Sequence, residues 1–193
     1  NLYDYGASSV WGDWEWYHSE IDTRNGPEHI HYFSPDPVRY PNGMKVVADK
    51  IEQMGLTPVL WIGVTHEPVL GDYMKKYPET VLCKQPEWCG EYFYDFTNPT
   101  YLDKVLPDAI KRWNYKGLKW DCLPVTQWVV DRYHEYLTDN QVTTDKAFKK
   151  VIKQAREILG DDFYMLSCAG SMDREVRFAM DVFDGARIGG DIF

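Results

Sequence analysis

The feature that most constrains the fold is an alternation of short apolar runs with amphipathic segments. The short runs, bounded by glycine or proline, are typical of strands buried on both faces. They cover residues 54–64, 115–123, 162–170 and 185–193. Segments with helical spacing of apolar residues cover 43–54, 98–113, 143–160 and 171–183. Strands that alternate with helices predict βαβ units and a parallel sheet.

Local signals mark the helix boundaries. Asn98 and Pro99 suit an N-cap and a first helical position. Gly160 ends one pattern, and Ser171 is a candidate N-cap for the next. Pro107 lies inside the 98–113 pattern, so we expect a kink or break there.

Such a pattern fits either a doubly wound sheet or a (β/α)8 barrel. No GxGxxG motif or P-loop follows any of the strands, which disfavours a nucleotide-binding doubly wound sheet. Residues 1–42 differ from the rest, being loop-like and rich in aromatic residues, proline, aspartate and histidine. No linker or repeat is evident, so we expect a single domain over residues 1–193.

Composition narrows the possible partners. The 193 residues carry a net charge of −9, which argues against nucleic acid or an anionic membrane surface and favours a neutral or cationic small ligand. No apolar stretch approaches the roughly 20 residues of a membrane span. No signal peptide is recognisable at the N-terminus, and secreted, periplasmic and cytoplasmic locations all stay open. The sequence does not indicate the oligomeric state. The aromatic content of 16% suits both a packed core and a sugar site.

The four cysteines and five histidines give no strong metal signal. Cys83 and Cys89 are close enough in sequence to close a small loop, but the spacing does not show that they do. His29 and His31 are one residue apart without an acidic or cysteine partner at ligand spacing. We therefore expect no metal and no cofactor.

The run "GLKWDCLP" carries the first chemical signal. Residues two apart in a strand point to the same face, so Lys119 and Asp121 share a side near the end of the strand. A buried carboxylate requires a partner, and a nearby lysine would keep it ionised. Asp191 also ends a strand-like run, after "RIGG". Two carboxylates at one barrel mouth are the minimum set for glycoside hydrolysis.

Five segments in order resemble the retaining α-galactosidase and α-N-acetylgalactosaminidase clan, glycoside hydrolase families 27 and 36. They are "YPNGMKVVADKIEQMGLTPVLW", "YDFTNPTYLDKVLPDAI", "GLKWD", "LSCAGS" and "ARIGGD". The resemblance covers residues 40–193 and implies a (β/α)8 TIM barrel, of which this chain holds roughly the second to sixth strands. It also implies an enzyme that needs no cofactor and acts on an oligosaccharide or glycoconjugate.

The resemblance assigns roles to individual residues. Asp121 would be the nucleophile and Asp191 the general acid/base of a double displacement that releases terminal α-linked galactose or N-acetylgalactosamine. The carboxyl groups of these two residues should then lie roughly 5–6 Å apart. Residues expected to bind the sugar are Lys119, Arg187, Cys168, Gly170, Asp13, Trp14, Trp16 and Trp61.

Some residues depart from the family pattern and leave alternatives open. Asp13 stands where the family usually has an Asp-Asp pair, and Leu123 stands where family 36 often has asparagine. "GGDI" is also similar to a segment of family 31, so an α-glucosidase or α-xylosidase is one alternative. A non-catalytic carbohydrate-binding or degenerate barrel fragment is the other. With strands missing, we expect an exposed sheet edge and an isolated chain that could be inactive.

Overall fold

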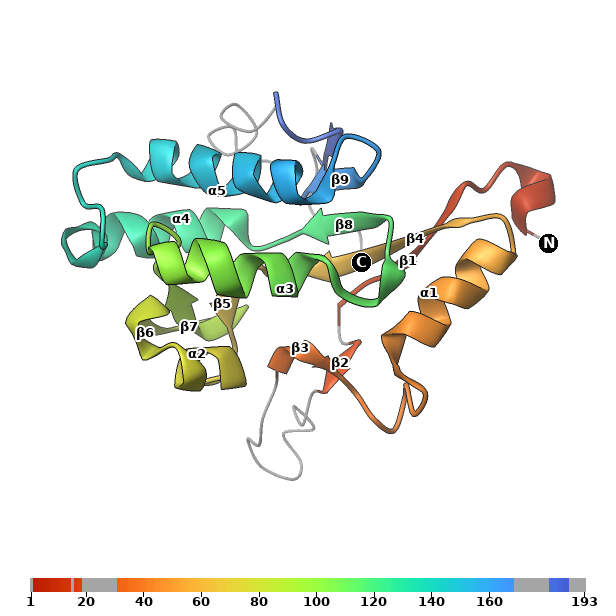
Figure 1. The fold of residues 1–193 in the computed structure, drawn as a ribbon, viewed down its shortest axis with the longest axis horizontal. Helices are drawn as coiled ribbons and strands as arrows, with labels where there is room; N and C mark the ends of the chain where they lie inside the picture. The colour runs from red at the N-terminus through yellow and green to blue at the C-terminus, as the bar shows by residue number, and fades with distance from the viewer. Residues whose placement is uncertain (1, 15, 19–30, 169–180, 188–193) are drawn as a thin grey trace.

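The computed structural model describes residues 2–14, 16–18, 31–168 and 181–187 (Figure 1). The strands are β1 Ser9–Gly12, β2 Tyr17–His18, β3 His31–Pro35, β4 Thr57–Ile62, β5 His66–Glu67, β6 Val81–Glu87, β7 Gly90–Tyr94, β8 Gly117–Trp120, β9 Tyr164–Ser167 and β10 Gly185–Ala186. The α-helices are α1 Gly43–Gln53, α2 Asp72–Lys76, α3 Leu106–Ile110, α4 Leu123–Arg132 and α5 Thr144–Leu159. A π-helix, η3, covers Tyr101–Val105, and short 3-10 helices are η1 Leu2–Tyr5, η2 Pro78–Thr80, η4 Arg112–Asn114 and η5 His134–Tyr136.

The main sheet has five strands in the order β1-β4-β8-β9-β10, and every neighbouring pair is parallel. The α/β class with a parallel sheet is therefore confirmed. Strands β4, β8, β9 and β10 lie within the four predicted runs. Helices α3, α4 and α5 pack beside one another next to the sheet. Helix α1 lies apart from them, on the right in Figure 1, and contacts β4.

Several elements were not expected from the sequence, β1, the small antiparallel sheets and α4 among them. Residues 1–42 were predicted to be loop-like, but β1 pairs with β4 at the edge of the main sheet, so this prediction was wrong. A three-stranded antiparallel sheet, ordered β5-β7-β6, stands between β4 and η3 in the chain. Helix α4, which begins after Asp121 and Cys122 at the end of β8, was not predicted either. The predicted helix over 171–183 lies mostly outside the described residues.

The irregularity expected near Pro107 takes the form of a π-helix, and the helix is not broken there. The turn before Pro107 is the π-helix η3, and α3 begins at Leu106. Proline has no N–H to donate and its ring clashes with the carbonyl four residues back, and the wider π-helical turn before it accommodates Pro107 within a continuous helix. Asn98 caps the start of this segment as predicted, because its Oδ1 accepts a hydrogen bond from the backbone N–H of Thr100 at 2.8 Å.

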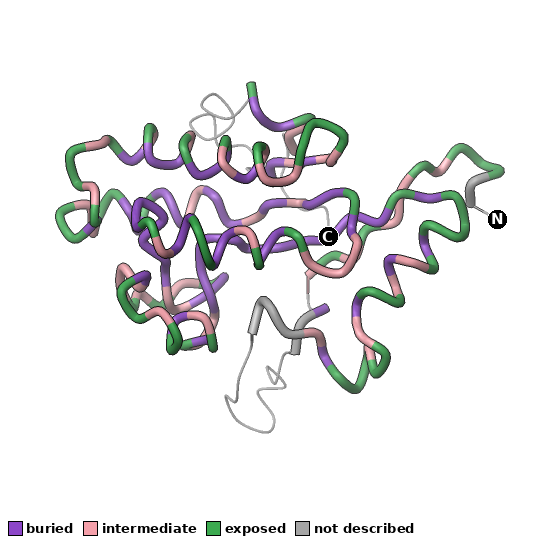
Figure 2. Tube along the Cα trace, in the orientation of Figure 1, coloured by how far each residue is buried: buried purple, intermediate pink, exposed green. Residues whose placement is uncertain are grey.

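The core lies between the sheet and the helices, where buried residues line β4, β8 and the inner sides of α3 and α5 (Figure 2). Helix α5 buries one stripe at helical spacing, as the sequence predicted, and Phe148, Val151 and Ile152 form its centre. Among the described residues, no helix is both long and apolar enough to cross a membrane.

Replacing Thr143 by alanine should lower the free energy of unfolding by about 1 kcal/mol. Thr143 is the N-cap of α5, and its hydroxyl accepts a hydrogen bond from the backbone N–H of Lys146 at 3.4 Å. Urea denaturation would measure the change. Thr143→Ser keeps the hydroxyl and serves as the control. Equal stability of the two variants would contradict a capping role.

Candidate active site at the strand ends

Four of the five parallel strands are followed directly by a residue that the sequence identified as a site candidate. These residues are Asp13 after β1, Asp121 after β8, Cys168 after β9 and Arg187 after β10. The carboxyl ends of parallel strands lie at one edge of a sheet, which is where α/β proteins bind their ligands. The strand register therefore gathers residues that are up to 174 positions apart, from 13 to 187.

Backbone hydrogen bonds continue the sheet through these residues. The N–H of Asp121 donates to the carbonyl of Ile62 at 3.1 Å, and the N–H of Cys168 donates to Trp120 at 2.8 Å. The N–H of Arg187 donates to Ser167 at 2.9 Å. Asp121, Cys168 and Arg187 are therefore held by the sheet itself, which fixes their positions relative to one another.

Asp121 is held by donors on both carboxylate oxygens. Its Oδ2 accepts a hydrogen bond from the indole N–H of Trp61 at 2.6 Å, and its Oδ1 accepts one from the backbone N–H of Cys122 at 2.6 Å. Hydrogen bonds to a charged group contribute about 1.5–3 kcal/mol each. Their geometry gives the carboxylate a fixed orientation at the end of β8.

Cys168 borders the same carboxylate. Burial raises the pKa of the Cys168 thiol to about 12, and the negative charge of Asp121 acts in the same direction. The charges of Lys119 and Arg187 act oppositely and are outweighed. Cys168 is therefore a neutral thiol at physiological pH. Its weak S–H donor faces Asp121, which suits a pocket-lining role and not a nucleophilic one.

Lys119 joins β8 to the end of β1. Its Nζ lies 2.8 Å from Oδ2 of Asp13, and the lysine side chain is only 13% exposed. Burial alone would lower the pKa of Lys119, but the hydrogen bond to Asp13 and the negative charges nearby, including that of Asp121, raise it above its ordinary value. Lys119 therefore stays cationic beside Asp121, although its direct partner is Asp13.

Tryptophans line the region beside Asp121. Trp14 contacts Trp61 edge to face, with ring centroids 4.7 Å apart, and lies nearly parallel to Trp88 at 6.1 Å. Trp88 is 69% exposed and was not singled out from the sequence. Trp16 is buried, and its indole N–H donates to the carbonyl of Trp61 at 2.6 Å. Trp16 thus fixes the backbone of Trp61, and because both are buried, the partly exposed Trp14 and the exposed Trp88 are the tryptophans that a ligand could reach.

Two of the predicted site residues, Asp191 and Gly170, lie outside the described residues. The predicted separation of the Asp121 and Asp191 carboxyl groups therefore stays a prediction. All other predicted site residues are described, and seven of the eight lie at or next to the ends of β1, β4, β8, β9 and β10. The eighth, Trp16, contacts this group through Trp61.

Solved structures with a similar arrangement of strands and helices include α-galactosidases. An enzyme from Thermus thermophilus, solved with p-nitrophenyl α-D-galactopyranoside, has a TM-score of 0.63 and 22% identity over 95% of this chain and 35% of its own. One from Lactobacillus brevis has a TM-score of 0.65 and 14% identity, covering 98% and 26%. A glycoside hydrolase family 36 enzyme from Geobacillus stearothermophilus has a TM-score of 0.63 and 16% identity, covering 96% and 27%.

The chain shares the α-galactosidase fold. The predicted resemblance is thereby confirmed at the level of the fold. No family model and no curated protein matches the sequence. The chain spans about a quarter to a third of the length of these α-galactosidase structures.

Beside the α-galactosidase-like sheet, strand β5 directs two adjacent side chains to opposite faces. Glu67 is fully buried, and its Oε1 accepts a hydrogen bond from the hydroxyl of Tyr94. Its Oε2 has no hydrogen-bond partner among the described residues. It lies so close to Gly71 that a Cβ there would be 1.6 Å away. Burial raises the pKa of Glu67 to about 8, although the Tyr94 hydrogen bond opposes this.

His66 points to the other face of β5, toward two cysteines. Its ring, Sγ of Cys89 and Sγ of Cys122 lie within 4.8 Å of one another, and all three residues are buried. A hydrogen bond from Cys122 and the charge of His66 lower the pKa of the Cys89 thiol to about 5, against the effect of burial. None of the four cysteines forms a disulfide, so Cys83 and Cys89 are not bridged in this structure. Sequence inspection missed this group because its members are 23 and 33 positions apart.

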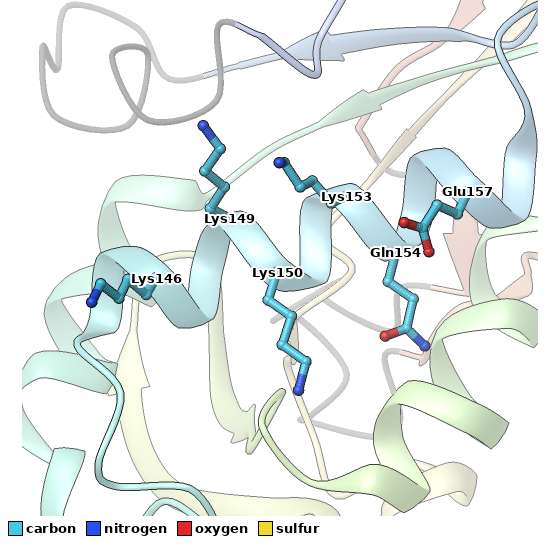
Figure 3. Close-up of a pocket in the computed structure, with 6 residues that line it drawn as sticks. All are labelled: Lys146, Lys149, Lys150, Lys153, Gln154 and Glu157. Carbon is cyan, nitrogen blue, oxygen red and sulfur yellow. The ribbon is translucent and has the colours of Figure 1, made fainter.

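A groove of about 460 Å³ lies on α5, away from the strand ends (Figure 3). It is lined by Lys146, Lys149, Lys150, Lys153, Gln154 and Glu157. The ammonium groups of Lys149 and Lys150 point to opposite sides of the helix in Figure 3, and Lys149 pairs with Asp181 at 2.8 Å. The lysines do not converge on one point, so they form the solvated face of an amphipathic helix and not an anion site.

Proposed function

We propose that this chain forms part of a retaining glycoside hydrolase that removes terminal α-linked galactose or N-acetylgalactosamine. The observation that carries the proposal is Asp121, a carboxylate held by two donors at the end of β8, near Lys119 and the stacked pair of Trp14 and exposed Trp88. The shared fold supports it. So do the neighbours' ligands, which include p-nitrophenyl α-D-galactopyranoside, stachyose and raffinose. We also propose that the five-stranded sheet belongs to a (β/α)8 barrel in the complete protein.

In this mechanism, a carboxylate oxygen of Asp121 attacks the anomeric carbon while the bond to the leaving oxygen breaks. The general acid, which we assign to Asp191, protonates that oxygen, so a glycosyl-enzyme ester and a free aglycone result. Asp191 then takes a proton from water, which attacks the same carbon and releases Asp121. No cofactor enters either step.

The surrounding residues have separate roles in this proposal. The Trp61 and Cys122 donors aim the carboxylate at the sugar. Asp13 and Lys119 offer an acceptor and donors to sugar hydroxyls, and Arg187 offers donors near the 2-position. The rings of Trp14 and Trp88 would cover the apolar face of the sugar, which is how flat aromatic rings bind hexoses.

A galacto-configured mechanism-based inactivator tests the proposal. Intact mass should show one adduct per chain, and peptide mapping should place it on Asp121. A gluco-configured inactivator is tested in parallel. An adduct with this compound and none with the galacto-configured one would favour the α-glucosidase alternative. Sugar binding without any adduct, in protein shown to be folded, would overturn the hydrolase assignment and favour a carbohydrate-binding protein.

Replacing Trp61 by phenylalanine should lower kcat about tenfold to a hundredfold, because it removes the N–H that orients Asp121 and keeps most of the ring. Steady-state kinetics on an aryl α-galactoside would measure the effect. Trp11→Phe is the matched control, since Trp11 is 37% exposed and donates only to Ser9. Unchanged kcat in folded Trp61→Phe would show that this hydrogen bond does not assist the nucleophile.

A further inference from the structure

Two thiols and an imidazole meet next to Asp121, and each comes from a different part of the fold. His66 belongs to β5, Cys89 lies in the turn between β6 and β7, and Cys122 directly follows Asp121. The sulfur atoms and a ring nitrogen lie within 4.8 Å of one another. Their exposed fractions are 0%, 2% and 1%, so the three donor atoms face one another inside the protein.

The local backbone makes room for this meeting. A Cβ at Gly63 would lie 2.4 Å from Cε1 of His66, and a Cβ at Gly90 would lie 2.9 Å from its Cδ2. Only glycine therefore lets the imidazole lie where it does. Cys122 adopts a left-handed backbone conformation, with φ of 63°, at the N-cap of α4. The two glycines and the left-handed conformation of Cys122 therefore allow the imidazole and the two thiols to come together.

We propose that His66, Cys89 and Cys122 bind a thiophilic divalent cation, with zinc as the ion that fits best. Two sulfurs and one imidazole nitrogen are a donor set that zinc prefers, whereas magnesium and calcium require oxygen ligands. Ligand atoms at the corners of a zinc tetrahedron lie about 3.5–3.8 Å apart. The three donor atoms reach that spacing by moving about 1 Å or less. This site revises the expectation from the sequence that no metal binds.

The charges also balance. Two thiolates neutralise the ion, and each thiol that is protonated beforehand releases its proton to solvent on binding. Three protein ligands leave a fourth tetrahedral position for water. The backbone N–H of Cys122 donates to Oδ1 of Asp121 at 2.6 Å. A metal bound to Cys122 would therefore hold the peptide that orients Asp121, which makes Cys122 a positioning residue and the metal a structural one.

Zinc binding by the reduced, chelator-treated protein tests this inference directly. After addition of excess zinc and removal of unbound ion, elemental analysis should find one zinc per chain. X-ray absorption at the zinc edge should find two sulfurs at about 2.3 Å and one nitrogen at about 2.0–2.1 Å, with a further light atom in the shell. Neither measurement depends on sugar hydrolysis, so the result stands whether or not the proposed function is correct.

Variants identify the ligands. Cys89→Ser and Cys122→Ser should each weaken zinc binding by more than about 100-fold in a competition titration with a chelator. Cys83→Ser is the matched control and should bind zinc as the wild type does, because Cys83 lies outside the group. If a variant does not fold, the X-ray absorption spectrum of the zinc-loaded wild type is sufficient to identify the ligand types. Substoichiometric zinc, or a first shell with fewer than two sulfurs, would overturn the proposal.

Discussion

Replacing Asp121 by asparagine is expected to lower glycoside hydrolysis by about 10³-fold or more while the protein remains folded. Loss of a covalent nucleophile removes the first chemical step and not only a binding contact. Asparagine keeps the size of the side chain and an oxygen that can still accept one of the two donors, from Trp61 or Cys122. Initial rates on an aryl α-galactoside, with circular dichroism as a folding check, would measure the effect.

A second variant distinguishes a nucleophile from a residue that only shapes the pocket. Asp121→Ala leaves space at the anomeric carbon, so added azide should attack there and restore turnover, with a glycosyl azide of inverted configuration as the product. Asp162→Asn is the matched control, because Asp162 is exposed in a turn and should leave the rate unchanged. Retention of more than a tenth of the activity in Asp121→Asn would contradict the nucleophile assignment.

Replacing Glu67 by glutamine is expected to stabilise the protein by about 3–5 kcal/mol at pH 8 and to have little effect near pH 4.5. Burial raises the pKa of Glu67 from 4.5 to about 8. Between these values the unfolded chain has lost the proton and the folded chain still holds it. The wild type therefore loses stability as the pH rises through this window, by up to about 1.4 kcal/mol per pH unit. Glutamine is neutral throughout and has nearly the same shape.

Urea denaturation at several pH values from 4.5 to 8.5 would measure this difference. The wild-type and Glu67→Gln curves should coincide at the acidic end and separate steadily above it. Glu79→Gln is the control, because Glu79 is exposed and the same change there should leave the pH dependence unaltered. Parallel wild-type and Glu67→Gln curves over the whole range would show that Glu67 is ionised in the folded protein.

The sequence predicted the central strands because their signals are local. Short apolar runs after glycine marked β4, β8 and β9, and the spacing of Phe148, Val151 and Ile152 marked α5. The polar residues that end those runs led directly to Lys119, Asp121 and Cys168. The fold then required only that parallel strands end at the same edge of a sheet.

Other elements could not be read from local patterns. Strand β1 is the four-residue run "SVWG", whose identity depends on pairing with β4 some 48 positions later. Helix α4 begins with "LPV" and has little contrast between its faces, so no stripe reveals it. In β6, Pro86 argues against a strand, yet the strand lies at the edge of the small sheet, where proline is tolerated. The group of His66, Cys89 and Cys122 exists only after these elements have come together.

The ion pair of Lys119 with Asp13 has a consequence for the time course of folding. It joins residues 106 positions apart, and the β1–β4 and β4–β8 pairs beneath it also link distant segments. Contacts of this kind form slowly, because the chain loses the entropy of closing a long loop before the contact can stabilise it. Helix α5, by contrast, is built from neighbours in the chain. We therefore expect a refolding chain to recover its helical signal well before Asp13, Lys119 and Asp121 come together at the strand ends.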